Sequence, residues 1–180
     1  ITGFLVSQRH NDMNLYPIPA DFINEKVNLS WCDIKWGYEN NLLTSEIPIK
    51  KAENSLLTEN YTNTELELSF LIPSESNDIT PFINELCPNF KEDEYENISE
   101  KWLYVILSWL WANRESFEDP LDEVENIYTD FDCPAEMDSF IKYMPPTDGY
   151  DPSLYSYAEN INRLMKNWES YLQKSAEKYK

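Results

Sequence analysis

Apolar residues recur at helical spacing most clearly over residues 97–115. Asn97 and Glu100 suit the N-cap and the third helical position, where a capping residue and an acid are favoured. The apolar positions of this segment are Ile98, Trp102, Leu103, Val105, Ile106, Leu107, Trp109 and Leu110. Because they cover nearly the whole circumference, the pattern predicts a central helix that is buried on most sides.

Shorter periodic segments, bounded by caps and prolines, predict further helices on both sides of this central one. Ser30 followed by Asp33 is a capping-box pattern, and Asp119-Pro120 is a cap followed by proline in the first turn. A long amphipathic segment closes the chain, with apolar positions from Tyr155 through Leu172. The helices expected from these patterns cover 19–26, 31–39, 46–57, 78–86, 120–128, 134–143 and 154–178.

Residues 64–72 are the ambiguous element. Leu66, Leu68 and Phe70 alternate as in a strand, but Leu71 breaks the alternation and no partner strand is visible. We expect a helix here, with a short strand at 65–72 as the alternative. The whole pattern predicts an all-α fold with seven or eight helices in a single domain over 19–180, preceded by an N-terminal arm over 1–18.

Composition supports a folded domain with a substantial core. The chain has 180 residues, of which 42% are hydrophobic and 14% aromatic. A disordered acidic tail would be poor in aromatic residues, so that class is excluded. The longest apolar run, Trp102–Trp111, contains ten residues, whereas a membrane span needs about twenty. We therefore expect a soluble protein with no membrane partner.

Negative charge is concentrated in one part of the chain. The formal net charge is −19, and residues 92–138 carry fifteen carboxylates against two basic side chains. Such a field disfavours nucleic acid and anionic lipid and attracts cations or basic protein surfaces. Two interpretations follow: a solvated acidic face, or a docking surface for a basic protein partner.

Cysteine usage indicates a reducing compartment. Cys32, Cys87 and Cys133 are odd in number, widely spaced and without a C-x-x-C pair, which is typical of reduced, partly buried thiols. Residues 1–16 also lack the apolar core and the cleavage site of a secretory signal. We therefore expect a cytoplasmic location. His10 is the single histidine, so no structural zinc site is expected.

The common catalytic patterns are missing from the sequence. Gly3, Gly37 and Gly149 are the only glycines, and none lies in a phosphate-binding loop. A nucleophilic triad is equally unsupported, and we expect no cofactor. Helical carboxylates three or four residues apart, such as Asp122 and Glu125, leave a Mg²⁺-dependent hydrolase as the alternative. That alternative requires acids from two helices to converge on a partly buried pocket.

The segment 143–151 is the most suggestive place for partner recognition. Several prolines stiffen it and Asp148-Gly149 turns it, so Tyr143, Met144 and Tyr150 would be anchors presented at low ordering cost. An equally open interpretation is that these side chains only hold the last two helices together. Trp36 and Trp111 lie off the main apolar stripes and are candidates for exposed contacts.

Five motifs in combination carry a resemblance to a known family. They are Ser30-Trp31-x-x-Ile34-x-Trp36-Gly37, Lys101-Trp102-Leu103-Tyr104, Asp119-Pro120-Leu121, Ile127-Tyr128-x-Asp130-Phe131-Asp132-x-Pro134 and Phe140-x-x-Tyr143-Met144-Pro145-Pro146. From about residue 20 onward the chain resembles a family of small bacterial proteins catalogued as domain of unknown function 2247. That family offers no catalytic residues to carry over.

The resemblance implies a role as an immunity protein, because relatives of such families are often encoded beside polymorphic toxins. The leading hypothesis is therefore a non-enzymatic, cytoplasmic module that neutralises a basic toxin domain; a housekeeping adaptor is a further possibility. The residues expected to bind the partner are Glu118, Asp119, Asp122, Glu123, Glu125, Asp130, Asp132, Tyr143, Met144, Asp148 and Tyr150.

Overall fold

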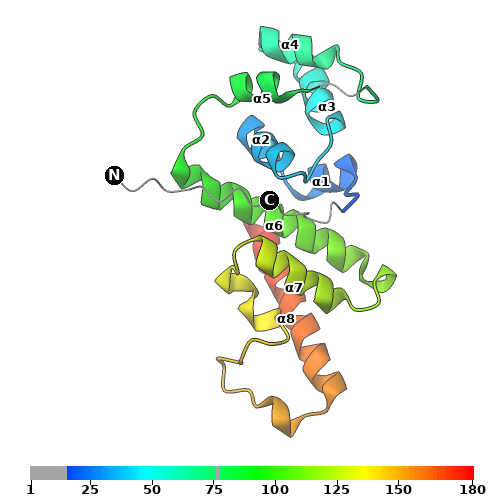
Figure 1. The fold of residues 1–180 in the computed structure, drawn as a ribbon, viewed down its shortest axis with the longest axis vertical. Coiled ribbons are helices and arrows are strands. Elements are labelled where there is room, and N and C mark those ends of the chain that lie inside the picture. The colour runs from blue at the N-terminus through cyan, green and yellow to red at the C-terminus, as the bar shows by residue number, and fades with distance from the viewer. Residues whose placement is uncertain (1–15, 76–77) are drawn as a thin grey trace.

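The computed structural model of the protein describes residues 16–75 and 78–180, and all regular structure in these ranges is helical (Figure 1). The α-helices are α1 Ala20–Lys26, α2 Trp31–Glu39, α3 Glu46–Ser55, α4 Asn63–Ser69, α5 Thr80–Leu86, α6 Glu92–Ala112, α7 Pro120–Asp130 and α8 Tyr157–Lys178. The 3₁₀ helices are η1 Arg114–Ser116, η2 Ala135–Phe140 and η3 Pro152–Leu154. The all-α prediction is confirmed, and helix α4 occupies the ambiguous segment.

Helix α6 lies across the middle of the molecule (Figure 1). Helices α1 and α2 contact it from one side, with α3, α4 and α5 beyond them, while α7 and α8 contact it from the other. The residues from Trp102 through Ser108, together with Ile98 and Leu110, are buried. The predicted central helix is therefore confirmed as the element on which both groups of helices pack.

The bounds of this helix differ from the predicted 97–115. It begins five residues earlier, at Glu92, and ends at Ala112. Its first turn contains Glu92, Asp93 and Glu94, which the positive end of the helix dipole favours, so the helix continues past Asn97 without a side-chain cap. At the other end, the Asn113 side chain donates to the Trp109 carbonyl, and a 3₁₀ turn follows.

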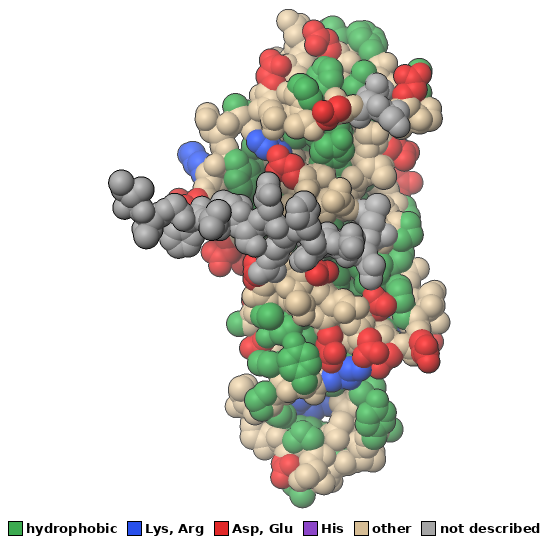
Figure 2. Space-filling model, viewed as in Figure 1, with side chains coloured by type: hydrophobic (Ala, Val, Ile, Leu, Met, Phe, Trp, Pro, Cys, Tyr) green, Lys and Arg blue, Asp and Glu red, His purple; other side chains and the backbone are tan. Residues whose placement is uncertain are grey.

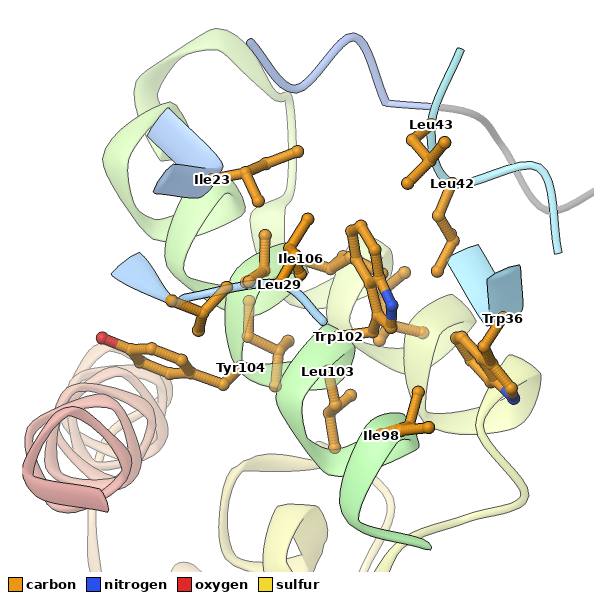
Figure 3. Close-up of a cluster of buried hydrophobic side chains, with 14 of the residues drawn as sticks. Ile23, Leu29, Trp36, Leu42, Leu43, Ile98, Trp102, Leu103, Tyr104 and Ile106 are labelled. Carbon is orange, nitrogen blue, oxygen red and sulfur yellow. The ribbon is translucent and has the colours of Figure 1, made fainter. Parts of the chain in front are cut away.

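The aromatic core depends on close approach between α2 and α6. The Trp102 ring reaches from α6 toward Leu42 and Leu43 (Figure 3), and its Nε1 donates to the Asp33 carbonyl at 2.9 Å. A Cβ added at Gly37 would lie 2.4 Å from Cζ2 of Trp102. Glycine at position 37 is therefore what allows the indole to lie against the α2 backbone.

A buried ion pair also joins α2 to α6. Asp33 is 2% exposed, and its Oδ2 accepts from the Lys101 Nζ at 2.6 Å and from the Ser30 N–H at 2.8 Å. The Ser30 hydroxyl accepts in turn from the Asp33 N–H, so the predicted capping box is confirmed. One carboxylate thus caps α2 and binds the central helix.

The expectation of three reduced thiols is wrong for Cys32 and Cys87. Their sulfur atoms form a disulfide that joins α2 to the end of α5, with a sequence separation of 55 and a Cα–Cα distance of 5.2 Å. Wide spacing concealed this pair, because only the packing of α2 against α5 brings the two residues together. Cys133 is a free, exposed thiol.

Two tryptophans proposed as exposed contacts are covered. Trp36 is 5% exposed and packs against Tyr95 and Phe131. Trp111 is half-buried, with its ring perpendicular to that of Trp168 at a centroid distance of 5.0 Å. Both side chains lie outside the main apolar face of their own helix, and residues from later in the chain cover them. The apolar pattern of one helix does not reveal such neighbours.

Two predicted helices near the C-terminus are shorter than expected. The segment 134–143 forms the 3₁₀ helix η2 over Ala135–Phe140, and α8 begins at Tyr157 rather than Leu154. Ser156 and Glu159 form a complete capping box that starts α8 there. Consequently Tyr155, which was expected on the apolar face of the helix, lies outside it and is 48% exposed.

Candidate partner-binding surface

Helix α7 presents the predicted acids because its apolar face is buried. Asp119 caps the helix by accepting from the Leu121 N–H at 2.9 Å, and Pro120 occupies the first turn. The side chains turned inward are Leu121, Val124, Ile127 and Tyr128, all of them buried. The remaining positions, which include most of the acids, are therefore left at the surface. Figure 2 shows acidic side chains in a row over the beginning of α7, with basic side chains directly beneath them.

Lys142 ties together two of the predicted acids. Its Nζ lies 2.9 Å from Oδ2 of Asp119 and also contacts the Asp122 carboxylate. Desolvation by itself would raise the pKa of Asp119, but the hydrogen bonds from Lys142 and Leu121 outweigh it and hold that pKa below its ordinary value. The hydrogen bond to Asp122 is the main reason why the pKa of Lys142 is raised. Much of the charge of these two acids is thus compensated within the molecule.

We expect this cluster to make stability depend on pH in a defined direction. The pKa of Asp119 is lowered and that of Lys142 raised on folding, so the pair stabilises fully between the ordinary values of 3.8 and 10.5. Its contribution is lost as the pH falls through the lowered pKa of Asp119. Lys142→Gln should reduce the free energy of unfolding by at most about 1 kcal/mol at neutral pH, because the pair is partly exposed.

Urea unfolding at about pH 7 and about pH 3 measures this difference. The gap between Lys142→Gln and the unaltered protein should narrow at the lower pH, because a pH of about 3 is below the ordinary pKa of 3.8 of an aspartate. Lys174→Gln makes the same charge change at an exposed site of α8 and is the matched control. A gap that persists unchanged in acid, or an equal gap for the control, would contradict the role of Asp119.

Another predicted acid, Glu123, is engaged by the segment preceding α1. Its carboxylate accepts a hydrogen bond from the Tyr16 hydroxyl. The Tyr16 ring packs 5.5 Å from that of Trp109 and 6.3 Å from that of Phe117. Burial, and next the bond to Glu123, raise the pKa of this phenol. Glu123 therefore holds a residue of the predicted arm against α6 rather than facing solvent freely.

The other acids of this region have different environments. Glu118 is exposed, and Glu125 is half-buried. Asp130 is half-buried at the last position of α7, and Asp132 is exposed with a positive φ of 63°. The end of α7 lies near the start of α6, because Trp36 packs against both Tyr95 and Phe131.

The loop that follows η2 begins against α7. Tyr143 is 60% exposed, and the edge of its ring meets Tyr128 of α7 at a centroid distance of 6.3 Å. Desolvation, together with the nearby Cys133 and Glu125, raises the pKa of Tyr143. Met144 is half-buried and packs against the core. The fold therefore brings the predicted loop and the acidic helix together at Lys142 and Tyr143.

The rest of the loop is held by α8. Arg163 binds Asp148 with a nitrogen–oxygen distance of 2.7 Å, and its guanidinium lies 4.1 Å from the centroid of Tyr150. The other neighbour of Tyr150 is Tyr155, stacked at 4.7 Å, and the Tyr150 hydroxyl donates to Asn160 at 2.6 Å. The Arg163 hydrogen bond lowers the pKa of Asp148. Asp148 and Tyr150 thus hold this loop to α8.

Three exposed apolar side chains, at the end of this loop and the start of α8, were not predicted. Leu154 and Tyr157 are each 75% exposed, and Tyr155 is 48% exposed. The signal that could have found them is Ser156, because a cap at that position ends the loop after Tyr155. Tyr143, Tyr155 and Tyr157 form the exposed aromatic set of this surface, and Leu154 adds an exposed aliphatic side chain.

A recess of about 230 Å³ lies between this loop and α8. Met144, Pro146, Tyr157 and Leu164 are among the residues that line it. Most of its exposed lining is apolar. It offers a place where an apolar side chain of a partner could insert beside the exposed tyrosines.

The described part of the chain contains no group of three or more His, Cys, Asp or Glu side chains arranged to hold a metal ion. The helical carboxylates of α7 instead meet Lys142 and Tyr16. Among the same residues, no helix is long and apolar enough to cross a membrane.

Residues 20–176 match the family DUF2247, described as an uncharacterized protein conserved in bacteria. The chain belongs to this family. No curated protein and no solved structure matches it. Because the match covers the chain from α1 to near the end of α8, the DUF2247 region includes both groups of helices and the loop at 143–156.

Proposed function

We propose that this DUF2247 protein is a non-enzymatic binding module that neutralises a basic protein, as an immunity protein neutralises a toxin domain. The observation that carries the proposal is a set of exposed aromatic side chains on a well-held loop and the first turn of α8. This loop begins beside the acidic helix α7. Contiguous exposed apolar groups on a soluble domain commonly mark an interaction site. Carboxylates next to them would attract a basic partner and orient it.

The internal contacts of the loop support this function because they reduce the ordering cost of binding. Asp148 and Tyr150 are held by Arg163, and Asn160 donates to the Pro152 carbonyl at 3.1 Å. The Asn167 side chain donates to the Ser139 carbonyl at 2.7 Å, which joins α8 to η2. Tyr143 and Tyr157 are therefore presented from a scaffold that is already formed. Preorganised anchors of this kind lose little conformational entropy on association.

The acids divide into two roles in this proposal. Asp119, Asp122 and Glu123 have internal partners and would mainly maintain the shape of the surface. Glu118 is exposed and Glu125 lies close to Tyr143, so these two would contribute most directly to attraction. Tyr143, Met144 and Tyr157 would supply the apolar contacts that determine how long the complex lasts.

The test uses toxin-like proteins encoded next to the gene, each purified and measured against this chain. Glu118→Lys combined with Glu125→Lys should lower the association rate roughly tenfold or more at low salt and weaken its salt dependence. Tyr143→Ala and Tyr157→Ala should act mainly on the dissociation rate. Glu53→Lys with Glu59→Lys makes the same charge change at exposed sites around the end of α3 and should have a much smaller effect.

An association rate that does not change with salt in the unaltered protein would count against this function. If the Glu118/Glu125 and Glu53/Glu59 double variants had equal effects, the binding surface would not be at α7. The competing Mg²⁺-hydrolase hypothesis predicts heat from divalent-cation binding in calorimetry, and such heat would favour it over a purely protein-binding role.

The location of the protein is part of the proposal, and the disulfide bears on it. Cys32 and Cys87 form a disulfide, so cysteine usage does not support a reducing compartment. Structural disulfides are typical of oxidising compartments and are rare in the cytosol of mesophiles. An immunity protein that meets its toxin outside the cytoplasm is compatible with this bond, and fractionation of the native host would locate the protein.

A further inference from the structure

The group of helices on the other side of α6 contains a pocket whose charge is opposite to that of the whole molecule. Its volume is about 560 Å³, and it lies between one face of α3, the end of α1 with the following residues, and Tyr179 near the end of the chain. Three lysines, Lys26, Lys50 and Lys51, line it against a single acid, Glu25. In a chain of net charge −19, a local charge of two positive is a distinct feature.

The lysines of this pocket, Lys26, Lys50 and Lys51, form no ion pair with the described carboxylates. Lys51 rests 5.4 Å from the centroid of Trp31, and Lys26 lies at the same distance from that of Phe22. Aromatic faces hold these ammonium groups without neutralising them. The charges therefore remain available to a ligand.

The rest of the lining combines uncharged donors with an apolar floor. Asn24, Asn28 and Asn54 line the pocket, and no described group forms a hydrogen bond with their side-chain amides. Val27, Leu29 and Ile34 are buried beneath it, and the half-buried Ile47 and Tyr179 supply exposed apolar surface. A cavity of this size lies within the range of small-molecule sites, which are largely apolar with a few polar groups that fix orientation.

We propose that this pocket binds a small organic phosphate, namely a phosphomonoester with an apolar body. Two net positive charges match the charge of a phosphomonoester at neutral pH, which lies between about −1.5 and −2. Lysine is a common phosphate ligand that acts as a point charge. The phosphate would lie among Lys26, Lys50 and Lys51, and the apolar body would lie on Ile47 and Tyr179. This site is separate from the partner-binding surface and does not depend on the function proposed for it.

Phenyl phosphate is the probe, and the 180-residue chain is observed by ¹⁵N–¹H NMR during titration. Saturable shifts are expected for the amides of Val27, Asn28, Lys51 and Asn54, with weaker binding as salt is added. Lys50→Gln combined with Lys51→Gln should raise the dissociation constant roughly tenfold, since each lysine provides a charge-assisted contact. Lys91→Gln combined with Lys174→Gln makes the same charge change elsewhere and should leave the affinity within about twofold.

A neutral analogue and a singly charged analogue of phenyl phosphate test whether binding depends on the phosphate charge. Benzyl alcohol should not saturate these shifts, and benzoate should bind more weakly than phenyl phosphate. The proposal is overturned by an absence of saturable shifts at millimolar phenyl phosphate, by equal binding of benzyl alcohol or benzoate, or by equal losses in both double variants. Circular dichroism of each variant shows whether the fold is retained, and Lys50→Arg with Lys51→Arg should restore binding if charge is what matters.

Discussion

Replacing Cys32 and Cys87 with serine should lower the free energy of unfolding by about 4 kcal/mol. The disulfide closes a loop with a sequence separation of 55, and cross-linking a loop of that length removes conformational entropy of this order from the unfolded chain. The effect should be large because the bond lies between α2 and α5, both of which are short. Chemical unfolding in oxidised and variant forms measures it.

Cys133→Ser is the matched control, because this thiol is exposed and unpaired. It should leave the unfolding free energy almost unchanged. Thiol labelling of denatured, unreduced protein should modify one cysteine, and labelling after reduction should modify three. Three labelled cysteines without reductant would mean that the bond does not form, and the stability of the double variant would then equal that of the unaltered protein.

Lys101→Met should be comparably damaging, at about 3–5 kcal/mol, because it leaves the buried Asp33 carboxylate without its counter-charge. The Lys101 Nζ lies 2.6 Å from this carboxylate and also donates to the Asn28 carbonyl at 3.2 Å. Asp33 additionally caps α2, so its solvation cannot be recovered by simply turning outward. Urea unfolding of the variant at neutral pH measures the loss.

A double-mutant cycle with Asp33→Asn separates the ion pair from packing of the lysine stem. When Asp33 is already neutral, Lys101→Met should cost much less, because no buried charge is then left unpaired. Equal costs in the two backgrounds would show that the loss comes from packing alone. Lys174→Met on the exposed part of α8 should have little effect in either background.

Helices and their caps were predictable because both depend on residues close in sequence. Ser30 with Asp33 forms the expected box, and Asp119 followed by Pro120 begins α7 as expected. The apolar period of α6 correctly indicated a helix buried on most sides. Its first turn was missed because Glu92 and its acidic neighbours start the helix through the dipole, without the cap that the sequence pattern sought.

Candidate contacts were harder to predict because they depend on which element packs next to which. Trp36 looked available on its own helix, yet Phe131, almost a hundred residues later, covers it. Asp119 and Asp122 looked like free surface charges, yet Lys142 joins them from beyond η2. A count of charges along the chain therefore overstates the negative field that a partner would meet over α7.

The sequence by itself determined the all-helical architecture, the central position of the Trp-rich segment and the overall acidity, since periodicity, local capping and charge count are properties of neighbouring residues. Only the tertiary structure decided that Cys32 bonds Cys87, that Lys101 neutralises Asp33, and that three lysines face one pocket in an acidic protein. Each of these depends on a distance between residues far apart in the chain, and such distances are set by the packing of whole helices rather than by any local pattern.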